Sequence, residues 1–138
     1  MFIEMGQGGN GGQTETTLWT NNAPTSAFTS QEISLSQAYT NFKRIRFEFR
    51  GSTTDSTEDA VEYLKEDVDD WVIAGVNPTA YKQIGGITFL YGGTSYVRLI
   101  RKGTNNNASA FYITTAYKGN QSGNSTSYGI PTKIVGIN

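Results

Sequence analysis

The chain has 138 residues, a length typical of one domain, with 11 basic and 12 acidic residues and a net charge of −1. It contains no cysteine and no histidine. Disulfides, cysteine- or histidine-dependent catalysis and the commonest zinc ligands are therefore excluded. The near-neutral charge does not favour nucleic acid as a partner. No apolar run reaches the roughly 18 residues of a membrane span, so we expect no membrane insertion.

The first segment of the chain is rich in glycine, which stands at positions 6, 8, 9, 11 and 12. Such a composition predicts a flexible segment, either a native tether or extra residues added for recombinant expression. The expected organisation is a tether over residues 1–13 followed by a single β domain over residues 14–138. A tether would mean that the domain is displayed on a larger assembly.

The first half of the domain contains several short runs typical of β-strands. Residues 14–20 and 31–36 are the first two, and residues 42–50 are the clearest. In the third run, Ile45, Phe47 and Phe49 alternate with charged residues, which indicates one buried and one solvated face. Residues 60–67 fit either a short helix or an alternating strand, and the neighbouring strands favour a strand.

The second half continues the same pattern, with runs at 71–74, 87–91, 95–101, 109–117 and 128–137. Glycines at 92 and 93 predict a hairpin between the second and third of these runs. Pro131 in the last run predicts an edge strand or a bulge. Eight or nine strands at roughly ten-residue spacing predict an all-β fold, an antiparallel, jelly-roll-like β-sandwich of about eight strands.

Eight of the twelve acidic residues fall between Asp55 and Asp70. Asp67, Asp69 and Asp70 are candidate ligands for Ca²⁺, the one cofactor that we consider, although the spacing does not match an EF-hand. A solvated acidic loop is the favoured alternative. A glycosidase with two carboxylates needs no histidine and stays open as a further alternative. Nothing in the pattern indicates a buried acid, so we predict no catalytic residues and no enzymatic activity.

Aromatic side chains beside polar loops suggest carbohydrate binding, because sugars pack on aromatic rings while polar groups contact their hydroxyls. The candidate ligand-binding residues are Trp71, Tyr81, Tyr96, Arg98, Arg101, Tyr117 and Asn120. Packing in a core or an interface is the alternative for each ring.

Seven of the eleven basic residues lie on two expected strands. They are Lys43, Arg44, Arg46, Arg50, Arg98, Arg101 and Lys102. If the two strands are neighbours, these side chains form a basic stripe suited to a phosphate-rich polymer. Pairing with the acidic segment is the alternative, and the near-zero net charge favours it.

Two segments resemble a known family. Residues 15–28 contain Leu18-Trp19-Thr20-Asn21, then Pro24 and Phe28, and Gln31, Ile33 and Leu35 follow. Residues 130–137 read IPTKIVGI. Together they resemble a C-terminal module of tail-tip, minor structural or receptor-binding proteins in phages and prophages of Gram-positive hosts.

The resemblance brackets residues 15–137 and implies a virion protein at the phage tail, assembled in the bacterial cytoplasm. It implies an oligomer such as a trimer, neighbouring tail or baseplate proteins as partners, and contact with a host cell-surface polysaccharide. The matching residues look structural, with Leu18 and Trp19 in the core, and they carry over no binding residues. A virion module that binds host carbohydrate is the leading interpretation, and a purely structural virion domain is the alternative.

Overall fold

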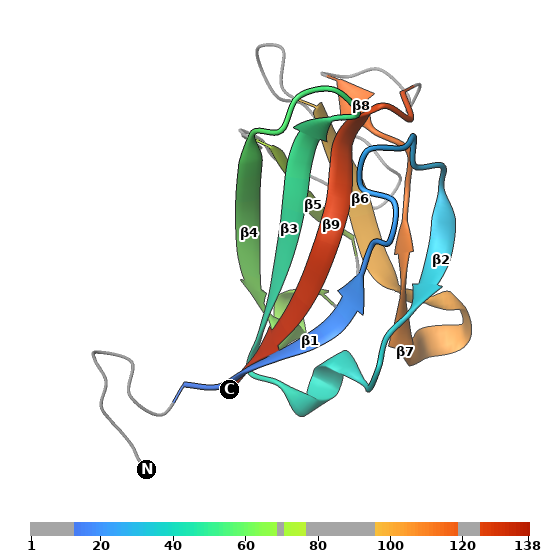
Figure 1. Cartoon of the computed structure of the whole chain (residues 1–138). Helices are drawn as coiled ribbons and strands as arrows, with labels where there is room; N and C mark the ends of the chain where they lie inside the picture. The colour runs from blue at the N-terminus through green and yellow to red at the C-terminus, as the bar shows by residue number, and fades with distance from the viewer. Residues whose placement is uncertain (1–12, 69–70, 77–95, 119–124) are drawn as a thin grey trace.

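The computed structural model describes residues 13–68, 71–76, 96–118 and 125–138. Two antiparallel sheets pack face to face as a β-sandwich (Figure 1). The first sheet has the strand order β1-β9-β3-β4, and the second has the order β2-β7-β6-β5, with a short β8 that pairs with β6. The predicted all-β sandwich of about eight strands is confirmed. β1 and β2 pair with the late strands β9 and β7, the nested pairing expected of a jelly-roll-like fold.

The strands fall close to the expected runs. The first sheet consists of β1 (Glu15–Thr20), β9 (Tyr128–Ile137), β3 (Arg44–Ser52) and β4 (Glu58–Leu64). The second consists of β2 (Gln31–Ser34), β7 (Asn107–Ile113), β6 (Tyr96–Gly103), β5 (Val72–Val76) and β8 (Tyr117–Lys118). Short 3₁₀ helices lie at η1 (Tyr39–Asn41), η2 (Lys65–Val68) and η3 (Thr104–Asn106). The ambiguous segment at 60–67 is thus a strand that ends in η2, and the expected hairpin at 87–94 lies outside the described residues.

The core lies between the two sheets and follows the alternation of each strand. On β3, Ile45, Phe47 and Phe49 point inward and are almost fully buried. Phe47 meets Phe111 of β7 edge to face, with ring centroids 5.3 Å apart. Each large buried side chain contributes on the order of 2 kcal/mol to stability. The space between the two sheets is thus occupied by the side chains of the core.

The central strand β9 is irregular where it carries Pro131. The register between β3 and β9 shifts at this point, because Glu48 pairs with Lys133 whereas Phe49 pairs with Pro131. The prediction of a bulge at Pro131 is thus confirmed, although the strand lies inside the sheet rather than at its edge. The Asn21 side-chain amide donates to the Pro131 carbonyl at 2.8 Å, so the loop after β1 is tied to the bulge.

Candidate functional site

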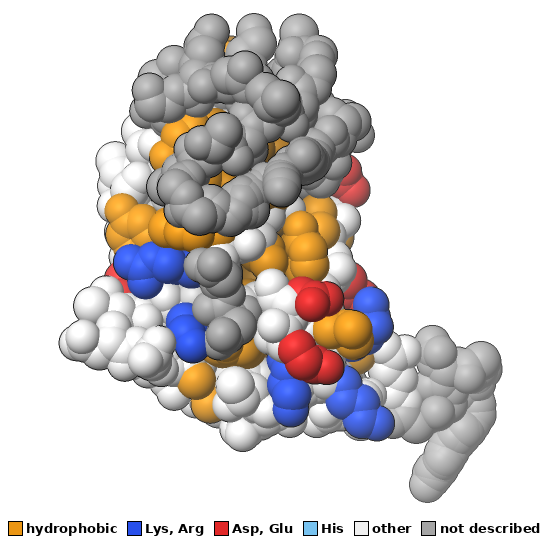
Figure 2. Space-filling view, turned by 180° about the vertical axis from the view of Figure 1, so that it is seen from behind, with side chains coloured by type: hydrophobic (Ala, Val, Ile, Leu, Met, Phe, Trp, Pro, Cys, Tyr) orange, Lys and Arg blue, Asp and Glu red, His pale blue; other side chains and the backbone are white. Residues whose placement is uncertain are grey.

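Three of the predicted ligand-binding residues, Trp71, Arg101 and Tyr117, lie on the outer face of the second sheet. Alternation places them there, because Ile100 of β6 points into the core and its neighbour Arg101 points outward. Trp71 and Tyr117 pack against Val97 and Leu99, which form a small apolar cluster on this outer side. Figure 2 shows hydrophobic side chains gathered on this side of the molecule, with Lys and Arg side chains at their margin.

An arginine on this face packs over two aromatic rings. The Arg101 guanidinium carbon lies 5.3 Å from the centre of the Trp71 ring and 5.0 Å from that of Tyr112. The two rings meet edge to face at 6.4 Å. Arg101 and Tyr112 are direct cross-strand partners on β6 and β7, and each such contact contributes about 0.5–1 kcal/mol. We call Trp71, Arg101, Tyr112 and Tyr117 the aromatic patch.

A carboxylate extends the aromatic patch toward the edge strand. Glu32 of β2 is the cross-strand partner of Tyr112. Its side chain accepts hydrogen bonds from the backbone and the hydroxyl of Thr104, both at 2.8 Å. These bonds, with a smaller contribution from Arg101, lower the pKa of Glu32. The patch therefore presents aromatic rings, a cation and an ionised carboxylate along one row of the sheet.

The phenol of Tyr117 is partly enclosed. Burial is the main cause that raises its pKa, and the nearby Tyr112 adds to the effect. The phenol therefore stays neutral and able to donate a hydrogen bond at physiological pH. Tyr112 was not among the predicted ligand-binding residues. Its position in the alternation of β7, between the buried Phe111 and Ile113, was the signal that could have placed it outward.

Arg98 does not lie on this face, although the sequence made it a candidate for ligand binding. Its side chain points into the sandwich and is fully buried. It donates to the backbone carbonyls of Phe28, Thr114, Thr126, Tyr128 and Gly129 at 2.7–3.4 Å. With its donors engaged inside the protein, Arg98 stabilises the fold and is not available at the surface.

The remaining candidates are apart from the aromatic patch or outside the described residues. Tyr96 stacks on Tyr128 with ring centroids 4.2 Å apart, and Tyr128 is 44% exposed. This pair joins β6 to β9, so it forms a separate aromatic surface. Tyr81 and Asn120 lie outside the described residues.

Only one of the three candidate calcium ligands lies within the described residues. Asp67 lies in η2, whereas Asp69 and Asp70 fall in an undescribed gap. In the part of the chain that the structure describes, no three acidic side chains come together as metal ligands. The calcium site stays a prediction.

The basic stripe is not formed, because its two strands belong to different sheets. Arg44 and Arg46 of β3 face outward on the first sheet, where they pair with Glu62, Glu15 and Glu48. Of these three acids, only Glu62 lies in the acidic segment between Asp55 and Asp70. Pairing with that segment, the alternative to a basic stripe, is therefore found for Arg44 alone among the ion pairs of the described residues. Arg101 lies on the opposite sheet. Periodicity within a strand does not show which sheet the strand joins.

No protein-family model matches the chain, and no curated protein shows detectable similarity to it. Among the described residues, no helix is long and apolar enough to cross a membrane. What is established is therefore the class of fold, a β-sandwich with an aromatic patch on the outer face of one sheet.

Proposed function

We propose that the chain is a non-enzymatic, tail-associated module of a phage or prophage that binds a host-surface carbohydrate through the aromatic patch. The observation that carries the proposal is the row formed by Trp71, Arg101 and Tyr112 on the outer face of the second sheet. Aromatic rings offer the apolar surface on which sugar rings pack, and the flanking arginine and carboxylate can bond to hydroxyl groups.

The virion part of the proposal rests on the sequence resemblance of the two family-like segments, whose strands lie in the first sheet. The first segment contains β1 and the second lies in β9, and these strands pair along their length. Leu18 is buried and Trp19 packs against the core, with its ring 6.2 Å from that of Phe28. Both segments thus serve the fold, which leaves the opposite sheet for a ligand. Under this proposal the module sits at the tail of the virion, oligomeric and beside other tail proteins.

The test is binding of the purified protein to cell walls and to an array of bacterial polysaccharides. Trp71→Ala should weaken binding at least tenfold, which corresponds to about 1.4 kcal/mol, because it removes one of the two rings beside Arg101. Leu64→Ala is the matched control, since Leu64 is an exposed apolar residue on β4 of the other sheet.

Arg101→Gln should also weaken binding, and Arg44→Gln on the first sheet is its control. Equal loss in a patch variant and its control would overturn the assignment of the patch. No binding to any wall polysaccharide, together with stable incorporation into tails, would instead favour the purely structural virion domain.

A further inference from the structure

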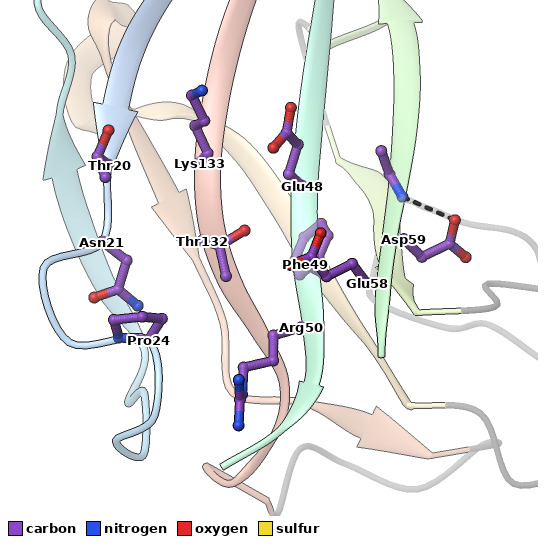
Figure 3. Close-up of a pocket in the computed structure, with 11 residues that line it drawn as sticks. Thr20, Asn21, Pro24, Glu48, Phe49, Arg50, Glu58, Asp59, Thr132 and Lys133 are labelled. Atoms are coloured by element: carbon purple, nitrogen blue, oxygen red, sulfur yellow. Dashed lines mark hydrogen bonds between the residues drawn. The ribbon is translucent and has the colours of Figure 1, made fainter. Parts of the chain in front are cut away.

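The outer face of the first sheet holds a second surface feature, a pocket of about 520 Å³ that spans all four of its strands (Figure 3). One wall is the loop after β1, which includes Asn21 and Pro24. The bond from Asn21 to the Pro131 carbonyl fixes this loop beside the bulge. The loop that forms this wall is therefore held by the bulged part of β9, and the pocket lies on the sheet opposite to the aromatic patch.

Two of the carboxylates in the lining are already engaged. Glu48 pairs with Arg46 at 2.9 Å. The Asp59 carboxylate accepts from the backbone of Ala60 at 2.8 Å and points away from the other side chains drawn (Figure 3). Glu48 is thus paired with a cation outside the lining, and the Asp59 carboxylate keeps its charge but is directed away from the other lining side chains.

Three further charges in the lining form no ion pair within the residues that the structure describes. These are Arg50, Glu58 and Lys133. Arg50 uses its Nε for the Ser52 carbonyl, and its charge also attracts Asp55 outside the lining. The ends of its guanidinium and the Lys133 ammonium keep unused donors. The charged groups left to contact a ligand are thus two cations and one carboxylate, which suit a ligand that carries both an anionic group and hydroxyl donors.

The uncharged part of the lining mixes hydroxyl and amide groups with small apolar residues. Thr20, Thr132 and Asn21 are polar, whereas Pro24 and Ala60 are apolar. Thr20 lies beside Lys133 at one end, Arg50 lies at the other, and Thr132 and Glu58 lie between them (Figure 3). Among the described lining residues the single aromatic ring belongs to Phe49, whose side chain is only 1% exposed and belongs to the core. A neutral sugar would find no ring face for stacking here.

From this arrangement we propose that the pocket is a second binding site, which takes a small hydroxylated anion. The carboxylate or phosphate of the ligand contacts Lys133 and Arg50 through charge-assisted hydrogen bonds. Its hydroxyl groups donate to Glu58 and exchange hydrogen bonds with Thr20 and Thr132. A sugar acid and a polyol phosphate share this chemistry.

Binding is measured by isothermal titration calorimetry on the whole chain with four probes: glucuronate, glycerol 3-phosphate, glucose and inorganic phosphate. We expect roughly millimolar binding of a hydroxylated anion, tighter than that of glucose and of inorganic phosphate. Preference for glucuronate identifies a sugar acid, and preference for glycerol 3-phosphate identifies a polyol phosphate.

Two results would overturn the proposal: no binding of either hydroxylated anion, or binding of inorganic phosphate with equal affinity. The first is expected if Lys133 and Arg50 simply pair in solution with their cross-strand partners Glu48 and Glu58.

Variants locate the site. Lys133→Gln should weaken the preferred anion about tenfold, because one charge-assisted bond is lost. Glu58→Gln should weaken it while leaving inorganic phosphate as strong or stronger, because only the hydroxyl contacts are lost. Lys65→Gln is the control, since it removes one positive charge outside the pocket. Equal weakening by Lys65→Gln would mean that net charge alone attracts the anion. Trp71→Ala, on the opposite sheet, should leave the affinity for the anion unchanged.

Discussion

Arg98 connects three segments that are distant in the sequence. Its guanidinium donates to carbonyls at Phe28, at Thr114 and in the stretch from Thr126 to Gly129. Its charge also lies over the Phe28 ring, 5.1 Å from the ring centre. Burial lowers the pKa of Arg98 to about 9, and the carbonyl acceptors favour the charged form. The guanidinium therefore stays protonated at neutral pH and holds both ends of the domain against β6.

Replacing Arg98 with methionine should destabilise the protein by at least about 3 kcal/mol, because several buried carbonyls lose their donor at about 1–3 kcal/mol each. Arg98→Lys keeps the charge but lacks the planar set of donors, so we expect an intermediate loss. Urea denaturation followed by tryptophan fluorescence measures both. A methionine variant within about 1 kcal/mol of the parent would contradict this structural role.

The sequence could not show that Arg98 is buried, whereas it did show the burial of Phe47. On β3 only one of the two alternating sets is apolar, so the inward face is unambiguous. On β6 both sets contain large apolar residues, Val97 and Leu99 on one face and Ile100 on the other. Alternation then gives no preference for either face. The carbonyls that satisfy Arg98 come from distant segments, which no local pattern contains.

At the scale of the elements, β9 is the strand on which the first sheet depends. It pairs with β1 on one side and β3 on the other, and its bulge coincides with Pro131. Pro131 within a β-like run made a bulge one of the two predicted outcomes at this position. The pocket was not predictable, because it also needs the loop after β1 to lie beside the bulge, and this depends on a contact between positions 21 and 131.

Asn21→Asp tests that contact. The variant keeps the oxygen that accepts from the Ala23 backbone at 2.8 Å, but it replaces the amide donor to the Pro131 carbonyl with a second oxygen. We expect a loss of about 1–2 kcal/mol in the free energy of unfolding, since a hydrogen bond becomes an unfavourable contact between two acceptors. Chemical denaturation measures the loss, and Asn41→Asp in η1 is a control away from the bulge. An equal change in both variants would argue against the contact.

Arg46 joins strands on both sides of β9. It reaches across that strand to Glu15 of β1 at 2.9 Å, and these hydrogen bonds lower the pKa of Glu15. A carboxyl whose pKa is lowered on folding stabilises the protein above its ordinary pKa, and this contribution is lost as the pH falls through the folded value.

Glu15→Gln should therefore cost up to about 1 kcal/mol at pH 7, a modest amount because the pair is exposed to solvent. The difference from the parent should shrink as the pH falls through the lowered pKa of Glu15 and vanish once its carboxyl is protonated. Denaturant titrations at several pH values measure it. A difference that persists unchanged in acid would show that the ion pair is not its origin.

At the scale of the whole molecule, the aromatic patch and the pocket lie on outer faces of opposite sheets. Stacked sheets are about 10 Å apart, and the core between them is closely packed. The aromatic patch contains one cation and three aromatic rings, whereas the pocket lining offers two cations, the Glu58 carboxylate and hydroxyl groups for contact. The two surfaces therefore suit different ligands, and binding at one need not displace a ligand at the other.

This separation predicts independent binding. Saturating the pocket with its preferred anion should leave the affinity for a wall polysaccharide within about twofold. In the double variant, Trp71→Ala and Lys133→Gln should change the free energy of binding of each ligand by the sum of their separate effects. Calorimetry of the four proteins, with and without the anion, measures both. Competition between the two ligands would mean that one polymer spans both faces or that the sites are coupled through the core. If the anion weakens polysaccharide binding only in the presence of Lys133, the polymer itself reaches the pocket.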